Sequence, residues 1–206
     1  LSDMHKFGLP LTLSALMLGV SACATVAPYA SNETLDVKTV TPFAETPAVA
    51  SSEDAADDPA IWVHPEDVSK SLILGTDKQA GLYVYNLKGE FLQFLKAGRV
   101  NNVDVRTIET KDGPRHIAAA SNRTDNTVAL FEISADTLKV ESVGAIDIAK
   151  DSEVYGYCLG KNAKGELLSL VNTKDGKVWV HKVELSTMVA ERLAIWQFNS
   201  QLEGCS

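Results

Sequence analysis

The sequence is poor in basic charge and in cysteine, and no stretch of it makes a convincing amphipathic helix. Nineteen lysines and arginines stand against 27 aspartates and glutamates, so the net charge is −8 at pH 7. This balance, with no basic run, argues against a nucleic-acid or anionic-membrane surface and favours cations as partners. No glycine-rich phosphate loop or Ser-His-Asp order stands out. His64, His116 and His181 lack metal-ligand spacing, and we expect them to be strand or loop residues.

The first 23 residues have the pattern of a secretion leader. We expect the natural start at Met4, after three residues of a partial reading frame. A weakly positive head precedes a mostly apolar core over residues 7–20, too short to span a bilayer comfortably. The core runs into Val-Ser-Ala-Cys, which resembles a bacterial lipobox and makes Cys23 the candidate lipidation site. An ordinary cleavable signal peptide is the alternative. Either leader predicts export, to the cell envelope as a lipoprotein or as a secreted protein.

The rest of the chain divides into a tether and one domain. Residues 24–44 are rich in Ala, Thr, Ser and Val and contain two prolines, a composition typical of a linker. From residue 59 onward, short, often alternating apolar runs are separated by turn residues, so the period is two and the predicted class is all-β. The expected strands form three groups of four: 60–64, 72–76, 81–86 and 91–95; 103–109, 116–121, 127–133 and 138–143; 154–159, 167–172, 177–184 and 191–198.

The leading strands of these groups recur at a regular spacing. They begin near residues 60, 103 and 155, and a fourth opens at Glu203, which gives a period of about 45–50 residues. Four strands at that period are the signature of a β-propeller blade, with a sandwich or meander of accidental spacing as the alternative. Three blades cannot close a ring. We therefore expect the domain at 45–206 to be truncated at its C-terminus.

Three carboxylates, Asp54, Asp57 and Asp58, lie within five residues just before the first expected strand. Like charges at this density repel and raise one another's pKa unless a cation lies between them. Hard oxygen ligands of this kind suit Ca²⁺ or Mg²⁺. A solvated acidic turn closed by Pro59 is the alternative.

The turn between the second and third strands of each group carries one cation: Lys78, Arg123 and Lys174. A single such cation is ordinary surface decoration, but three in register point toward one end of the propeller axis and imply an anionic ligand such as phosphate. The loops entering the leading strands belong to the same end and carry acids or amides: Asp54, Asp57, Asp58, the run 101–104, Glu153 and Glu203. Such a rim suits metal ions that bridge to a phosphorylated substrate, or a structural ring of salt bridges.

Two of these stretches, residues 54–62 (DAADDPAIW) and 101–106 (NNVDVR), resemble the signature motifs of the β-propeller phytases. The similarity continues through Gly75–Lys78, Ala120–Arg123, Glu153–Gly156 and Ser200–Gly204. The resemblance implies a six-bladed propeller that hydrolyses phosphomonoesters of myo-inositol hexakisphosphate with several Ca²⁺ ions. In that family, a calcium-bridged water attacks phosphorus directly, without a phosphoenzyme.

The resemblance also implies roles for individual residues. Lys78, Arg123, Tyr155 and Lys174 match substrate-phosphate positions and are the candidate catalytic residues. Asp175 stands beside the substrate lysine where some members have Glu. Asp57, Asp58, Val103 through its carbonyl, and Glu203 match calcium-binding positions. Gln79 departs from the family, which often has a second Lys there.

The favoured hypothesis is therefore a calcium-dependent phytase acting on phytate and lower inositol phosphates, expected to be a monomer that touches a membrane only through its lipid. A non-catalytic propeller that binds a partner on the cell envelope is the alternative. The sequence lacks the Arg-His-Gly-x-Arg-x-Pro run of the histidine acid phosphatases. Because later blades supply further calcium ligands in the family, the fragment alone is expected to be inactive.

Two cysteines remain beside Cys23, and they lie at matching places near the third and fourth leading strands. In an oxidising compartment Cys158 and Cys205 could pair if their Cα atoms lie within about 7 Å. Two buried free cysteines are the alternative.

Overall fold

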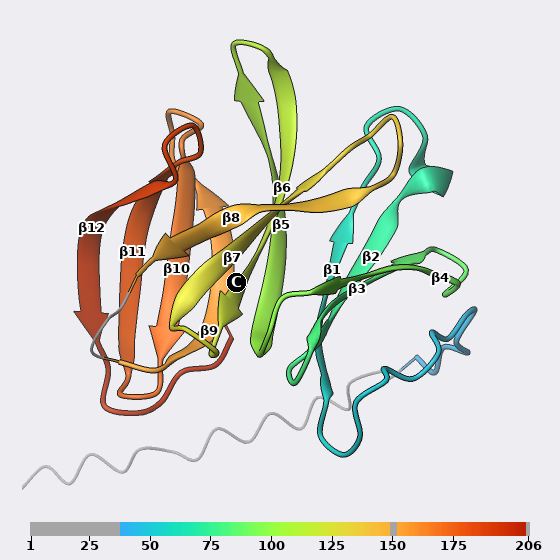
Figure 1. Cartoon of the computed structure of the whole chain (residues 1–206), viewed down its shortest axis with the longest axis horizontal. Helices are drawn as coiled ribbons and strands as arrows, with labels where there is room; N and C mark the ends of the chain where they lie inside the picture. The colour runs from blue at the N-terminus through green and yellow to red at the C-terminus, as the bar shows by residue number, and fades with distance from the viewer. Residues whose placement is uncertain (1–37, 149–151, 205–206) are drawn as a thin grey trace, which may run out of the picture. The chain divides into compact units, whose positions relative to one another are not determined.

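The computed structural model describes residues 38–148 and 152–204, all but the first three of which belong to one unit that begins at Thr41. In this described part, consecutive strands form three four-stranded antiparallel sheets, coloured from cyan to orange-red along the chain (Figure 1). The first sheet contains β1 (Ala56–Trp62), β2 (Leu72–Asp77), β3 (Gly81–Asn86) and β4 (Phe91–Lys96). The second contains β5 (Val100–Thr110), β6 (Gly113–Asn122), β7 (Thr127–Ile133) and β8 (Val140–Asp147). The third contains β9 (Val154–Lys161), β10 (Leu167–Thr173), β11 (Lys177–Glu184) and β12 (Val189–Gln197).

Each sheet is an up-and-down meander of sequential strands, the topology of a propeller blade. The first strands of neighbouring sheets pack together, since β1 contacts β5 and β5 contacts β9. The prediction of an all-β propeller is confirmed, and the number of blades in the complete protein stays a prediction. Among the described residues the single helical segment is a three-residue 3₁₀ turn, η1 (Val68–Lys70), and none of their helices has the length and apolar character to cross a membrane.

Two leading strands begin earlier than the sequence pattern indicated. β1 begins at Ala56 and β5 at Val100, so Asp57, Asp58 and the run 101–104 lie within strands and not in the loops before them. Pro59 is tolerated inside β1 because the pairing of β1 with β2 shifts register between Ala56 and Pro59. A bulge of this kind is one of the few places where a strand accepts proline. Asp57 and Asp58 are therefore held by the sheet, which corrects the expectation that they lie in the loop before the first strand, while Asp54 precedes β1.

The hydrophobic core lies between adjacent sheets as two clusters. One cluster joins the first and second sheets around Trp62 and Phe131, and the other joins the second and third sheets around Leu130 and Tyr157. In β7, Ala129 and Phe131 serve the first cluster and Val128 and Leu130 the second. The period of two thus buries both faces of the middle sheet. Together with the contacts between the first strands, this packing sets the positions of the turns that carry the candidate site.

Candidate active site

Lys78, Arg123 and Lys174 occupy equivalent places in the three sheets. Each is the first residue after the second strand of its sheet. In each case the backbone N–H donates a hydrogen bond to the carbonyl of the residue that precedes the first strand. The three bonds are Lys78 N to Ala55 O at 2.8 Å, Arg123 N to Arg99 O at 2.9 Å, and Lys174 N to Glu153 O at 3.1 Å. The backbone therefore places one cation at the same corner of every sheet.

Arg123 and Lys174 meet at one carboxylate oxygen, Oε1 of Glu153. The Nε and Nη2 atoms of Arg123 each lie 3.1 Å from that oxygen, and Nζ of Lys174 lies 2.9 Å from it. The hydrogen bond from Lys174 is the largest cause that lowers the pKa of Glu153; desolvation opposes it and the bond from Arg123 adds to it. Glu153 is therefore ionised at neutral pH, and the two cations form a pair around it.

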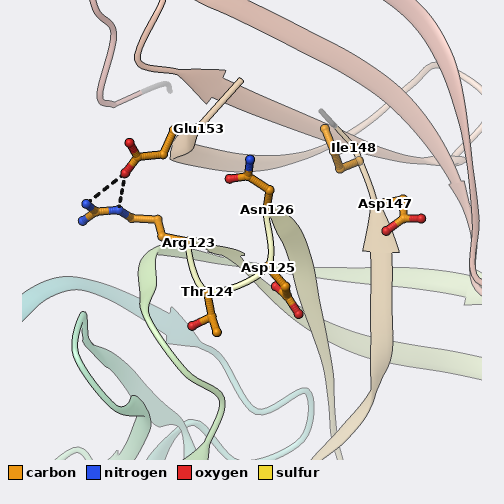
Figure 2. Close-up of a pocket in the computed structure, with 7 residues that line it drawn as sticks. All are labelled: Arg123, Thr124, Asp125, Asn126, Asp147, Ile148 and Glu153. Carbon is orange, nitrogen blue, oxygen red and sulfur yellow. Dashed lines mark hydrogen bonds and ion pairs between the residues drawn. The ribbon is translucent and has the colours of Figure 1, made fainter. Parts of the chain in front are cut away.

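A cavity of about 630 Å³ opens beside this ion pair (Figure 2). Figure 2 shows the side chains of Arg123 and Glu153 pointing toward one another at its edge. The other lining residues are Thr124, Asp125, Asn126, Asp147 and Ile148. Arg123 itself is mostly covered, with 14% of its side chain exposed. Most of the Arg123 side chain is therefore shielded from solvent.

Tyr155 underlies the same two cations. The Cζ atom of Arg123 lies 5.8 Å and Nζ of Lys174 5.4 Å from the centroid of its ring, within the range of a cation–π contact. Its hydroxyl donates a 2.9 Å hydrogen bond to Oε1 of Glu203. That bond is the largest cause that raises the pKa of Tyr155, and desolvation adds to it. The phenol is therefore a hydrogen-bond donor at neutral pH and not a base.

The backbone beside Tyr155 holds Glu203 in place. A Cβ at Gly156 would lie 1.5 Å from the carbonyl oxygen of Glu203, so the two backbones approach more closely than any other residue would allow. The side-chain amide of Asn172 donates to the carbonyl oxygens of Glu203 and Gly204 at 3.2 and 3.3 Å. These contacts bring segment 200–204 against the start of β9.

Lys78 is held by two acids of its own. Its Nζ lies 2.8 Å from Oδ2 of Asp54 and 3.4 Å from Oδ1 of Asp57, and the bond to Asp54 is the largest cause that raises its pKa. The charges of Lys78 and Asp57 also act on the pKa of Tyr155. Lys78 therefore lies close enough to Tyr155 for its charge to act on the phenol. Among the described residues, no direct contact joins Lys78 to Arg123 or Lys174.

Asp58 is a partly buried carboxylate with acidic neighbours. Its Oδ2 accepts a 2.9 Å hydrogen bond from the backbone N–H of Val103 on the neighbouring sheet. Burial is the largest cause that raises its pKa, and the charges of Asp57 and Asp104 raise it further against the hydrogen bond from Val103. It forms no ion pair with any described residue. A hard cation is the group that would relieve this excess of negative charge.

The remaining predicted ligands do not complete a metal centre. Asp57 contacts Lys78, and Oε1 of Glu203 accepts from Tyr155. Within residues 38–148 and 152–204, no three His, Cys, Asp or Glu side chains lie close enough together to hold a metal ion. Val103 meets Asp58 through its N–H; its carbonyl stays a predicted ligand. The donors fit a calcium ion in chemistry, and the described part of the chain supplies only some of them.

Asp175 lies in the turn of Lys174, but its carboxylate serves that turn. It accepts hydrogen bonds from Ser152 at 3.0 Å and Thr173 at 2.5 Å, and it pairs with Lys177, the largest cause of its lowered pKa. Among the described residues, none of its hydrogen bonds or ion pairs reaches Arg123 or Tyr155. Its assignment to substrate stays a prediction, and the structure favours a role in shaping the turn.

Sequence reasoning placed Glu153 on the acidic rim but gave it no role in the site, and it did not single out Gly156 or Asn172. A Glu just before a strand has no local signature, and its partners lie 21 and 30 residues away. The signal that could have found Gly156 was the glycine in Tyr-Gly. Asn172 has no like counterpart in the repeat, since Thr76 and Ser121 stand at the equivalent positions of the first and second sheets. Cys158 is buried and disulfide-bonded, while Cys205 and Cys23 lie outside the described residues, so the pairing of Cys158 with Cys205 stays a prediction.

Comparison with known proteins assigns the chain to a family. The family model described as Phytase matches residues 8–204. The chain belongs to the phytase family. A curated relative, the 3-phytase of Bacillus subtilis (strain 168), is 37% identical over 203 residues, covering 94% of this chain and 53% of the relative. This phytase-family chain thus spans about half the length of the curated relative that it matches.

Solved structures of low sequence identity also resemble the chain. A protein from Lactobacillus plantarum has a TM-score of 0.48 at 13% identity, covering 74% of this chain and 44% of the other. The periplasmic gluconolactonase of Pseudomonas aeruginosa has a TM-score of 0.47 at 15% identity, covering 69% and 41%. These likenesses carry no argument about the activity of the phytase-family chain.

Proposed function

We propose that the complete protein is a calcium-dependent phytase that hydrolyses phosphomonoesters of myo-inositol hexakisphosphate. Family membership and the relative named 3-phytase support the reaction class. The observation that carries the proposal is the pairing of Arg123 and Lys174 over the ring of Tyr155, with Lys78 at the equivalent corner of the first sheet. Converging cations of this kind suit a ligand that carries several phosphates.

The described residues have distinct parts in this proposal. Arg123 presents a planar guanidinium that can bind two phosphate oxygens, and Lys78 and Lys174 supply point charges. Such fixed cations stabilise the negative charge that develops on the transferred phosphoryl group. Tyr155, held as a neutral phenol, can donate a hydrogen bond when Glu203 releases it.

The proposed calcium dependence rests on the carboxylates. Asp58 would hold the ion, with Asp57, Glu203 and the carbonyl of Val103 as further oxygen donors and with ligands from the rest of the protein. Bound calcium supplies positive charge that offsets the phosphate and favours ionisation of water. The raised pKa of Asp58 and its lack of a cationic partner among the described residues support this assignment.

The test is release of inorganic phosphate from phytate by the complete protein, with calcium and after its removal by a chelator. Calcium-dependent release is expected. Binding of phytate without release at saturating calcium would instead indicate a non-catalytic binding module. Release that is unchanged by the chelator would reject the calcium dependence alone.

Export to the cell envelope, with lipid attached at Cys23, is part of the same proposal. The disulfide at Cys158 supports it, because disulfides persist in oxidising compartments and are rare in the cytosol. Metabolic labelling with a radioactive fatty acid tests the anchor. The wild-type protein should take up label and Cys23→Ala should not; labelling of Cys23→Ala would show that lipid attaches elsewhere.

A further inference from the structure

Among the described residues, Glu153 is the one acid that pairs with two of the proposed phosphate-binding cations. Its Oε1 accepts from Arg123, in the turn after β6, and from Lys174, in the turn after β10. Its backbone carbonyl accepts the N–H of Lys174 as well. One residue therefore holds Lys174 at both backbone and side chain and reaches across to the neighbouring sheet.

The two cations would not keep this arrangement without an anion between them. A guanidinium and an ammonium repel each other, and both rest on the ring of Tyr155, which carries no net charge to offset the repulsion. Hydrogen bonds to an ionised carboxylate are about twice as strong as neutral ones, so the bonds to Glu153 favour the observed directions of both cations. Arg123 also donates a long hydrogen bond from Nη1 to Oδ1 of Asn101 at 3.5 Å. Lys78 is held in the same manner by Asp54 and Asp57, but neither of those acids joins two cations.

We propose that Glu153 is a positioning residue that holds Arg123 and Lys174 as a pair for one substrate phosphate. The inference rests on the proposed phosphate-binding role of the two cations. Glu153 does not touch the substrate in this proposal. It fixes the spacing and direction of Arg123 and Lys174 beforehand, so that substrate binding does not pay the conformational entropy of ordering two long side chains.

The first experiment compares Glu153→Gln with wild type in the complete protein. Gln keeps the size and an acceptor oxygen but removes the charge. We expect KM for phytate to rise about tenfold, with kcat changed about threefold or less, because the charge-assisted contacts of both cations with Glu153 are weakened. The affinity for inorganic phosphate, measured by calorimetry without calcium, should fall by about the same factor. Glu153→Asp, which keeps the charge on a shorter side chain, should lie between the two.

A matched control distinguishes the positioning role of Glu153 from the general effect of breaking a surface ion pair. Glu191 on β12 pairs with Lys182 on β11 of the third sheet, with 2.6 Å between Oε2 and Nζ. Glu191→Gln should leave KM, kcat and phosphate affinity at wild-type values. A double-mutant cycle with Lys174→Met measures whether the two substitutions are coupled in their effects on KM and phosphate affinity. A general structural role of Glu153 would give no such coupling. In the Lys174→Met background the effect of Glu153→Gln should shrink to about twofold, because the residues act as a unit.

Three results would overturn the inference. KM and phosphate affinity could be unchanged in Glu153→Gln, or its effect could add to that of Lys174→Met. Tighter phosphate binding in Glu153→Gln would show instead that Glu153 competes with phosphate for the cations. If Arg123→Ala and Lys174→Met also leave KM and phosphate affinity unchanged, the proposed binding site itself is wrong, which distinguishes the two failures.

Discussion

The carbonyl oxygen of Glu203 lies where a side chain on Gly156 would have to be, since a Cβ there would come within 1.5 Å of it. Gly156 belongs to β9 and follows Tyr155, whose hydroxyl binds the Glu203 carboxylate. The absence of one side chain thus lets two distant segments touch, and it places an acid beside the cation pair.

Gly156→Ala should therefore displace Glu203 and lower activity. We expect a loss of about 1–3 kcal/mol in the free energy of unfolding, because backbone must move to accept the methyl group. Phytate hydrolysis and calcium affinity should fall together, as read from initial rates and from calorimetric calcium titration. Gly160→Ala, on the same strand, is a control for the general cost of replacing glycine, since a Cβ there would meet only side-chain carbons of Leu168 and Leu170 at 3.7 Å. Equal calcium affinity in Gly156→Ala and wild type would contradict a role for this contact.

Arg123→Ala should raise KM for phytate and lower kcat. The lost stabilisation of the transition state should be a few kcal/mol, or roughly a hundredfold in kcat/KM, because a cation aimed at phosphate is removed. Arg115→Ala is the comparison: Arg115 lies on the same strand, β6, and forms a bidentate pair with Glu132 at 2.9 and 2.8 Å. Steady-state kinetics of the two variants test this prediction. If KM and kcat of Arg123→Ala equal those of wild type, Arg123 does not belong to the site.

Asp58→Asn should separate calcium binding from folding. Without calcium, the variant should melt at the same temperature as wild type or higher, because it no longer buries a charge that burial and neighbouring acids disfavour. With calcium, wild type should gain stability by linkage and the variant should gain less. Differential scanning calorimetry with and without a chelator measures both, and Asp112→Asn, in the exposed β5–β6 turn, is the control. An undiminished calcium shift in Asp58→Asn would mean that this carboxylate is not a ligand.

His116 should make stability depend on pH near neutrality. It is 5% exposed, packs edge-on against Trp62, and hydrogen-bonds Thr107 through Nδ1 at 2.8 Å. Burial first, and then the charge of His64, lower its pKa. The contribution of neutral His116 to the free energy of unfolding is fully present above a pH of about 6.5, the pKa of histidine in the unfolded chain. It is lost as the pH falls from that value through the lower folded-state pKa, because the unfolded chain binds the proton more readily.

Thermal unfolding between pH 7.5 and pH 5.5 tests this prediction. The melting temperature of wild type should fall by a few degrees across the interval, roughly the shift that 1 kcal/mol produces in a domain of this size. The fall should be smaller in His116→Gln, although burial also lowers the pKa of His181, so a residual slope remains. An equal slope in His116→Gln would exclude this origin.

The sequence by itself determined the class, the number of sheets and the corner where each cation lies. A period of two in short apolar runs specifies strands whatever surrounds them, and turn residues set where each strand ends. Asn86 and Asn162 illustrate how local this information is: each caps a turn whose Gly, Gly89 or Gly165, has a φ of 79°. Because every sheet repeats one meander, equivalent positions in the repeat become equivalent positions in space.

Only the tertiary structure decided which acid meets which cation. Asp54 and Asp57 take Lys78, Glu153 takes both Arg123 and Lys174, and Asp58 is left with a backbone N–H of the next sheet. Composition predicts a mixed rim but not these partners. The pairing of acids with cations depends on the position of each sheet relative to its neighbour. The hydrophobic clusters around Trp62 and Tyr157, which contain no charged side chains, set that position. The start of β1 before its proline has the same origin, since pairing with β2 overrides the local preference for a turn.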